Sequence, residues 1–510
     1  MLKTVKLSTL AGLTVALMAI APATAQQRGG AINVATIGEP PTLDPMVSST
    51  DIVGMISQHI YETLFTFDKD WKTTPLLADG MPTISADGRI YTIKLRPGVT
   101  FHDGQAMTSK DVVASLKRWT DLASRGKQIV DNIASIEALD ATTVQISLKE
   151  PYAPLLALLA FNNSAAVIMP ADKLDNPIKD AIGTGPYRVK ERKPDQYLQL
   201  VRFDAYQSTS GEASGYGGAR HQYVDEIRFV PVPDANTRVE GALAGQFTYT
   251  DSLPIESYPR LKGSASEPVV LAPFGWPMFV MNNKEGLLSD VRLRKAVQIA
   301  LKQEDMLAAA FGDQAFYAVN APMYPKNFLW HTKAGAEPYN VGDPDKAKTL
   351  LKEVGYDGQK PLRIVTSRQY EFHYKMAQVA AEYLKLAGFN VAMEVVDWAT
   401  LVQRIRNPAL WEIFVTHSPF LADPALISIL SPTASGWWNT PAKIEAVAAL
   451  NKATTEAERI QLWEKVQSLI FAEAPLVKIG DFNSLSAKSP NLQGFTPSPW
   501  PAFWNVSLKP

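Results

Sequence analysis

Residues 361–397 read PLRIVTSRQYEFHYKMAQVAAEYLKLAGFNVAMEVVD, and three patterns follow one another in this stretch. The apolar run at 362–366 is typical of a buried strand, and the apolar residues from Met376 onward recur at the spacing of one helix face. Gly388 marks the end of that helix, and alternation over 391–395 indicates a second strand. A strand, a helix and a strand of this length join a parallel pair, so the stretch predicts an α/β fold.

Strand and helix signals also alternate in the rest of the chain. Apolar residues at every second position predict strands at 91–95 and 144–148. Between them, Thr108 with Asp111 three residues later has the pattern of a capping box, which begins a helix. A cap followed by a proline at 343–344 begins another helix. The chain shows no internal repeat.

The first residues have the three parts of a secretory signal peptide. Lys3 and Lys6 give a positive start, residues 7–21 are uncharged and mostly apolar, and residues 23–25 read Ala-Thr-Ala. The alternative is a membrane anchor, but the segment is short for a bilayer span of about 20 apolar residues. No cysteine follows, which excludes a lipoprotein anchor. The pattern predicts cleavage after Ala25 and a free periplasmic protein.

Composition limits the classes of function. The mature chain of about 485 residues is too long for one core, so two or three domains are expected. The net charge is −1, and it becomes −3 when Lys3 and Lys6 leave with the leader, which argues against a nucleic-acid partner. The chain has no cysteine, so disulfides and thiol chemistry are absent.

No motif for catalysis is present. The Ser- and Gly-rich stretch 207–219 lacks the strand-to-helix context of a nucleophile elbow and the Lys-Ser/Thr pair of a phosphate loop, so an exposed loop is expected there. The histidines lie far apart in the sequence, which speaks against a local metal site. They are His59, His102, His221, His331, His373 and His417. We therefore expect no enzyme and no cofactor; the rival hypothesis, a periplasmic hydrolase, would need a nucleophile and base that the sequence does not display.

Tryptophans are more informative than the charged residues. Trp119 and Trp463 lie on predicted helices and are expected in the core. Tryptophans of the C-terminal half, many of which stand beside proline or glycine in apparent loops, are candidates for a ligand pocket, because flat apolar rings can desolvate a guest. Plain packing is the equally weighted alternative for each. These candidates are Trp276, Trp398, Trp437 and Trp438.

Several motifs occur in order along nearly the whole chain. They are TLDP at 42–45, IYETL at 60–64, YTIKLRPGVTFHDG at 91–104, GTGPY at 183–187 and DVRLRKA at 290–296. Together they resemble the extracellular solute-binding proteins of the peptide/nickel/opine type, which feed ABC importers. The block at 91–104 is the most specific of the five.

The resemblance implies a two-lobed α/β periplasmic binding protein fold with an extra subdomain in lobe I. Lobe I would comprise residues 26–275 and 485–510, with the inserted subdomain at about 70–175. Lobe II would span residues 276–484. Crossover strands near Phe279–Asn282 and Val477–Gly480 would connect the lobes.

The resemblance also implies ligand-binding positions. Arg368 stands where members that bind dipeptides carry an arginine for the ligand carboxylate, and Trp398 follows at the matching spacing. Pairing of Arg368 with a structural carboxylate is the alternative. Phe420 stands where those members carry an aspartate for the peptide α-amine, in a stretch that begins at His417, and Asp423 follows three residues later. This departure counts against ordinary peptide binding, because a buried ammonium without a carboxylate costs several kcal/mol.

The implied function is capture of a small organic solute, such as a carboxylate-bearing opine-like conjugate or a modified peptide, and delivery to an ABC permease in the inner membrane. A peptide-binding protein with a relocated amine anchor is the second hypothesis in this class. We expect a monomer.

Overall fold

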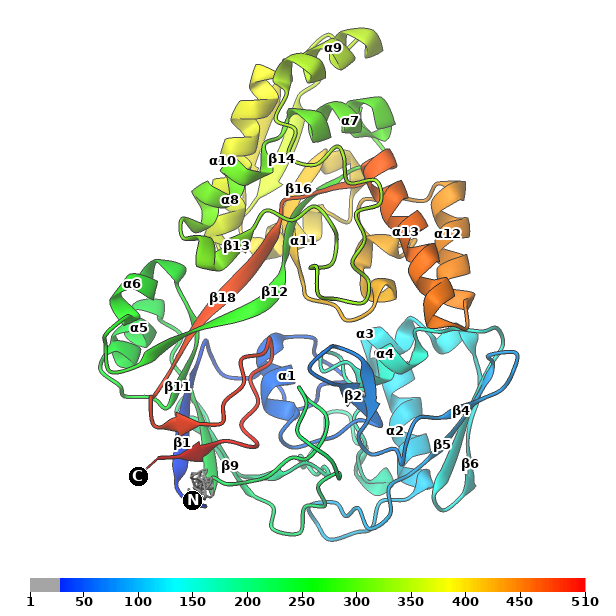
Figure 1. Cartoon of the computed structure of the whole chain (residues 1–510), viewed down its shortest axis with the longest axis vertical. Coiled ribbons are helices and arrows are strands. Elements are labelled where there is room, and N and C mark those ends of the chain that lie inside the picture. Colours follow the sequence, from blue (N-terminus) through cyan, green and yellow to red (C-terminus); the bar gives the residue numbers. More distant parts are fainter. Residues whose placement is uncertain (1–27, 510) are drawn as a thin grey trace, which may run out of the picture.

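The computed structural model describes residues 28–509, so the predicted leader at 1–25 lies outside the described residues. The molecule has an upper and a lower half in Figure 1, and two long strands run from one half to the other. These are β12 (Glu267–Met281) and β18 (Asp481–Lys488), which pair in antiparallel fashion.

The largest sheet extends through both halves. Its order is β15-β14-β16-β12-β18-β11-β1-β10-β9-β8, with β13 on β18 and β17 on β12. The strands of the lower half are β1 (Ala31–Thr36), β8 (Tyr187–Lys193), β9 (Tyr197–Arg202), β10 (Glu226–Pro231) and β11 (Tyr249–Leu253). Those of the upper half are β13 (Tyr317–Ala318), β14 (Leu362–Thr366), β15 (Val391–Val395), β16 (Ile413–Pro419) and β17 (Leu476–Lys478).

The upper half also contains helices, some of which pack on the sheet and others beside it (Figure 1). They are α7 (Val291–Ala300), α8 (Gln303–Phe311), α9 (Pro344–Val354), α10 (Glu371–Leu386), α11 (Trp398–Arg404), α12 (Pro441–Lys452) and α13 (Glu456–Glu473). The predicted strand–helix–strand unit is confirmed as β14, α10 and β15. The two strands are parallel, with Leu362 opposite Val391.

The lower half contains further small sheets and helices. A four-stranded sheet has the order β4-β5-β7-β6 and packs against α2. Its elements are β4 (Thr83–Ile84), β5 (Ile90–Lys94), β6 (Ile133–Asp140), β7 (Thr143–Leu148) and α2 (Ser109–Leu122). The remaining elements are α1 (Asp51–Ser57), β2 (Phe65–Phe67), β3 (Thr73–Pro75), α3 (Ser124–Lys127), α4 (Leu155–Ala160), α5 (Ala235–Leu243), α6 (Tyr258–Leu261), β19 (Leu492–Gln493) and β20 (Ser507–Leu508).

The predictions made from helix caps and from the two helical tryptophans are confirmed. The Thr108 hydroxyl and the Asp111 carboxylate form the capping box at the start of α2. Asp343 accepts from the Lys346 backbone N–H at 2.8 Å to begin α9, and Gly355 ends that helix in the left-handed conformation. Trp119 and Trp463 are fully buried, as expected.

Two expectations need correction. The crossover strand predicted near Phe279–Asn282 is β12, but the passage between the halves lies earlier along it, because Phe279 pairs with Val415 and Val477 inside the upper sheet. The register of β12 shifts earlier, between Leu271 and Gly275, where the strands pass from one half to the other. The Ser/Gly-rich stretch is irregular, but it is not wholly exposed: Tyr216 within it is buried.

Candidate functional site

An aromatic contact joins the two halves. Phe420 follows β16 in the upper half, and its ring centroid lies 4.6 Å from that of Trp71 in the lower half. Phe328 packs against Phe420 at the same centroid distance, and Phe420 is 3% exposed. A ring at this position excludes water from the seam between the halves.

A polar contact joins the halves a second time. The backbone N–H of Ala153 donates to the Asn451 carbonyl at 2.8 Å. Beside it, the exposed Lys452 ammonium lies 2.6 Å from the Glu150 carboxylate. We use the name junction for the region where the halves face each other, with an upper face (Tyr370, Trp398, His417 and Phe420) and a lower face (Asp51, Trp71, Asp251 and Trp500).

The upper face is built of aromatic rings and neutral imidazoles. Tyr370, just before α10, lies 4.9 Å from Trp398 and 5.0 Å from His417 between ring centroids. His417 Nδ1 and His373 Nε2 share a hydrogen bond of 3.0 Å. Burial lowers the pKa of His417 to about 4, and burial together with His417 lowers that of His373 well below its usual range. Both imidazoles are therefore uncharged at neutral pH.

Arg368 precedes Tyr370 of this face by two residues. Its Nη2 donates to the Tyr374 hydroxyl at 2.7 Å, and the guanidinium lies 4.1 Å above the Tyr374 ring. The side chain is exposed, and it forms no ion pair with any described carboxylate. Its charge is thus available to a ligand in this conformation.

The lower face carries carboxylates. Asp51 begins α1, which lies at the edge of the lower half nearest the upper half (Figure 1), and it accepts from Trp500 Nε1 at 3.1 Å. Asp51 is exposed, yet desolvation by the surrounding protein raises its pKa, while the hydrogen bond from Trp500 acts in the opposite direction. Burial also raises the pKa of Asp251, on β11, to about 6, while the Ser252 hydroxyl donates to it at 3.0 Å.

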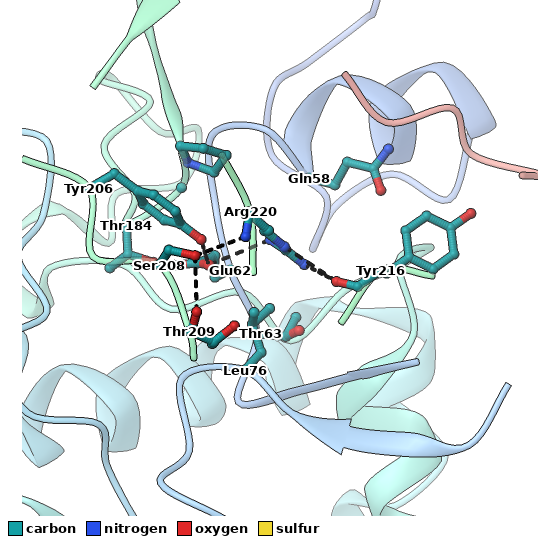
Figure 2. A network of polar contacts seen from close by, with 12 residues as sticks. Gln58, Glu62, Thr63, Leu76, Thr184, Tyr206, Ser208, Thr209, Tyr216 and Arg220 are labelled. Atoms are coloured by element: carbon teal, nitrogen blue, oxygen red, sulfur yellow. Dashed lines mark hydrogen bonds and ion pairs between the residues drawn. The ribbon is translucent and has the colours of Figure 1, made fainter. Parts of the chain in front are cut away.

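A buried ion pair supports the lower face from behind, and Figure 2 shows it. Glu62 accepts hydrogen bonds from the Thr184 hydroxyl at 2.9 Å and the Tyr206 hydroxyl at 2.8 Å. The Arg220 guanidinium lies 3.5 Å from the same carboxylate and donates to the Tyr216 carbonyl at 2.7 Å. The motifs at 60–64 and 183–187 therefore meet in this network.

The network leads on to Asp51. The Tyr216 hydroxyl accepts from the Trp500 backbone N–H at 3.1 Å, and the Trp500 indole donates to Asp51. Tyr216, Trp71 and Trp504 also line a cavity of about 260 Å³ beside the junction. The Ser/Gly-rich loop is thus held by Arg220 so that Tyr216 forms part of the cavity wall.

The remaining candidates lie within the upper half. Trp438 is fully buried, and its Nε1 donates to Glu473. Trp437 stacks on Trp411 at 5.7 Å, and Trp276 is a buried residue of β12. Trp276 and Trp438 belong to the same hydrophobic cluster as Phe420, and Trp437 packs against that cluster.

Asp423 is occupied by the chain itself. Its two oxygens accept from Arg459 Nη1 and Nη2 at 2.8 and 3.0 Å, and both side chains are buried. A doubly hydrogen-bonded guanidinium neutralises the carboxylate. The junction thus includes Trp398, His417 and Phe420 of the candidates, Arg368 lies two residues before Tyr370 in the sequence, and Asp423 faces Arg459.

Five residues of the junction were not among the candidates: Asp51, Trp71, Tyr370, Asp251 and Trp500. Asp51 opens a helix, and an acidic residue there favours the helix dipole in any protein, so its position carries no functional signal. Trp71 stands in a turn with a positive φ of 60°, and Tyr370 differs little from other aromatics in its pattern. Only the tertiary structure brings them together.

Two further observations concern the described residues as a whole. None of the helices in residues 28–509 is long and apolar enough to cross a membrane. The same part of the chain holds no group of three or more histidine, aspartate or glutamate side chains placed to bind a metal ion.

Comparison with known proteins adds to this geometry. Residues 72–436 match the model of the bacterial extracellular solute-binding proteins, family 5 middle. The chain is 29% identical over 498 residues to a "probable peptide ABC transporter periplasmic-binding protein" of Sinorhizobium fredii, with 91% of each chain covered. It is 28% identical over 475 residues to the glutathione-binding protein GsiB of Pectobacterium atrosepticum, with 89% of each covered.

Among solved structures, the ABC transporter substrate binding protein CtaP of Listeria monocytogenes has a similar fold. The TM-score is 0.81 at 23% identity, over 94% of this chain and all of that one. The likeness shows the two-lobed α/β fold that the sequence predicted.

Proposed function

The chain belongs to the bacterial extracellular solute-binding proteins of family 5, and from this premise we propose that it captures a small organic solute at the junction. As a member, it is the solute-binding component of an ABC importer and not an enzyme. The observation that carries the proposal is the contact of 4.6 Å between Trp71 and Phe420, which joins the halves around the polar residues. Family members deliver their ligands to membrane permeases, and a permease is the partner we propose here.

The two lobes in this proposal have the bounds that the resemblance implies. Lobe I comprises residues 26–275 and 485–510, with an insertion at about 70–175, and lobe II comprises residues 276–484. The register shift in β12 between Leu271 and Gly275 supports a boundary near residue 275. Opening at this boundary would separate Phe420 from Trp71 and admit the solute.

Arg368 is proposed to hold an anionic group of the solute. A guanidinium can bind a carboxylate through two parallel hydrogen bonds. Its exposure and its lack of an ion pair in the described chain support this role. Phe420 is proposed to keep an ammonium away from its own position, because the ring is enclosed by Trp71 and Phe328.

The second hypothesis, a peptide-binding protein with a relocated amine anchor, gains support from the carboxylates of the lower face. The names of the relatives include peptide and glutathione binding. Asp423 does not serve as the anchor in this proposal, because Arg459 already pairs with it.

Export completes the proposal. The leader would be removed after Ala25, and the mature protein would act in the periplasm as a monomer without a nucleic-acid partner, since the mature net charge of −3 gives no basic field. N-terminal sequencing of periplasmic material should begin at Gln26. Light scattering of the same material should give the mass of one chain.

Native mass spectrometry of the purified protein tests capture itself. We expect a solute that copurifies, and its readdition after removal should stabilise the protein by about 2.7 kcal/mol at 100 times the dissociation constant. Small-angle scattering should show a smaller radius of gyration with the solute than without it. A protein that carries and binds no small molecule would contradict the proposal.

A further inference from the structure

The two halves also meet on the side of the molecule away from the strands that connect them. In Figure 1, β12 and β18 pass between the halves toward the left, and the lower ends of α12 and α13 reach the lower half on the right. The contact on the right joins residues 150–153, which follow β7, to residues 451–454, which lead from α12 to α13. Because points far from a hinge move most when two bodies rotate about it, this contact forms only as the halves close.

Two polar interactions hold these segments together. The Ala153 backbone N–H donates to the Asn451 carbonyl at 2.8 Å. The Lys452 ammonium lies 2.6 Å from the Glu150 carboxylate, and both side chains are exposed, so this ion pair adds a modest attraction. The backbone hydrogen bond adds a geometric requirement, because its narrow range of distance and angle fits only one relative position of the halves.

A turn of the lower half approaches the same segment closely. Gly88 lies in the turn between β4 and β5 and has a φ of +69°. A Cβ atom at this position would lie 3.1 Å from Cγ2 of Thr454 and 3.3 Å from Cβ of Pro151. The left-handed backbone and the lack of space both favour glycine, and the missing side chain lets the turn reach the upper half.

Apolar side chains of both halves continue the contact inward. A cavity of about 190 Å³ lies beside the two segments, and its walls come from both halves. Tyr91, Tyr152 and Leu156 line it from the lower half, and Leu329 and Trp330 line it from the upper half. All five belong to one cluster of buried apolar side chains or pack against it. Removal of this apolar surface from water favours the closed form.

The contact does not use the residues proposed to bind the solute. Neither Arg368 nor any residue of the two junction faces lines this cavity, and none of them takes part in the hydrogen bond, the ion pair or the approach of Gly88. A solute at the junction therefore neither makes nor breaks these interactions. Their contribution to closing is the same in the presence and in the absence of a solute.

We propose that Gly88 and residues 150–153 of the lower half form a latch with residues 451–454 of the upper half, and that this latch populates the closed form in the absence of a solute. It rests on the proposed function, because the closed form is the one that captures the solute. The apparent dissociation constant is the intrinsic one divided by the fraction of protein in the binding-competent form. The latch therefore raises the affinity for every solute by the same factor and leaves the preference among solutes unchanged.

Cross-linking of the protein without solute tests the latch. The chain has no cysteine, so two introduced cysteines meet no competing thiol. The hydrogen bond between Ala153 and Asn451 brings their Cα atoms within the roughly 4.4–6.8 Å that a disulfide spans. Ala153→Cys with Asn451→Cys, freed of small molecules by unfolding, dialysis and refolding, should therefore form an intramolecular disulfide with oxidised glutathione. Mass spectrometry without reductant measures its rate of formation.

Charge reversal shows whether the latch itself populates the closed form. In the double-cysteine protein, Lys452→Glu turns the attraction to Glu150 into a repulsion and should slow cross-linking about threefold, the size expected for an exposed pair. Addition of Glu150→Lys should restore the rate. Lys465→Glu, at an exposed position of α13 without an ion pair in the described chain, is the matched control and should leave the rate unchanged. Labelling of the single-cysteine variants with a monofunctional reagent corrects for the effect of charge on the thiol.

A second cross-link guards against a disulfide that fails for reasons of geometry alone. A short bis-maleimide should bridge Glu150→Cys and Lys452→Cys in the protein without solute. Protein that forms neither cross-link overturns the latch, and so does a rate with Lys452→Glu equal to that with Lys465→Glu. Since no step uses a solute, the latch can stand even if native mass spectrometry finds no captured molecule and the proposed function fails.

Discussion

The carboxylates on the two sides of the junction differ in whether a cation of the chain neutralises them. On the upper side, Asp423 accepts two hydrogen bonds from Arg459, at 2.8 and 3.0 Å. On the lower side, Asp51 accepts one from an uncharged indole, and Asp251 one from a hydroxyl. An acid close to an expected ligand position is thus weak evidence of binding; the question is whether the chain itself neutralises the charge.

The largest expected effect is the loss of stability when Arg459 is removed, and this variant tests the paired carboxylate of the upper side. Arg459→Met leaves the buried Asp423 carboxylate without its cation, which should lower the free energy of unfolding by about 3–5 kcal/mol. Urea denaturation of the unliganded protein measures this loss. Arg368→Ala, which removes an exposed guanidinium, should change the same quantity by less than about 0.5 kcal/mol.

A similar urea midpoint for both variants would contradict the pairing. Asp423 would then be solvated or protonated in solution, and the contrast with the lower face would vanish. Recovery of stability in the double variant Arg459→Met with Asp423→Leu would sharpen the comparison, because a buried ion pair can often be replaced by apolar side chains without loss.

Phe420→Ala should have the next largest effect, on affinity more than on stability. The ring contacts Trp71 only when the halves meet, so its loss weakens the closed form that holds the solute. We expect about 2–3 kcal/mol of lost affinity, below the full cost of a buried Phe→Ala change because Phe328 remains. Calorimetry with the copurified solute measures it.

Trp71→Ala removes the same aromatic contact from the side of the lower half, and its affinity for the solute is measured in the same way. If the two rings act together, the double variant should lose less affinity than the two single losses combined. Unchanged affinity in Phe420→Ala would show that the contact of 4.6 Å between Phe420 and Trp71 does not hold the solute-bound state.

The sequence predicted those parts of the fold that depend on neighbours along the chain. Periodicity identified β14, α10 and β15, and caps identified the starts of α2 and α9. The division into lobes came from the family motifs, since no local signal says which strands cross. The crossover was misplaced because the apolar run 277–281 looks alike whether it is buried within a half or passes between halves.

Candidate residues were harder to predict because partners distant in sequence decide their role. Trp438 stands in a loop, as a pocket residue would, but its indole reaches Glu473 on α13. Asp423 stands close to the expected amine position, yet Arg459 faces it from 36 residues away. Asp51 has the local pattern of a helix start, and its hydrogen bond from Trp500, 449 residues away, appears only in the tertiary structure.

Arg368→Ala tests the proposed contact with an anionic group of the solute. It should cost about 2 kcal/mol of affinity, at the lower end of the range for a charge pair, because the side chain is exposed. Arg368→Lys should recover only part of this, since an ammonium cannot form two parallel hydrogen bonds to a carboxylate. Calorimetry with a carboxylate-bearing solute and its amide gives the comparison. A loss equal for both compounds would mean that Arg368 does not contact the carboxylate.

Asp251→Asn should have the smallest effect and the opposite sign, because it removes an uncompensated charge. The carboxyl has a pKa of about 6 in the folded chain against 3.8 as the reference value. Between these values the folded state binds a proton that the unfolded state does not, so this group lowers stability increasingly as the pH rises from about 4 to about 6. The variant should therefore be more stable than the native protein at pH 7, by about 1–2 kcal/mol after allowance for partial exposure.

The stability of the native protein alone would not reveal this pH dependence of Asp251, because buried imidazoles change the stability in the opposite direction over the same pH range. Burial lowers the pKa values of four histidines, so the unfolded state takes up protons first and total stability falls below about pH 6.5. These are His59, His102, His373 and His417. The informative quantity is the difference between Asp251→Asn and native protein, which should be largest at pH 7 and shrink toward zero near pH 4. A difference that does not vary with pH would mean that Asp251 is compensated in solution, and the lower face would then resemble the upper one.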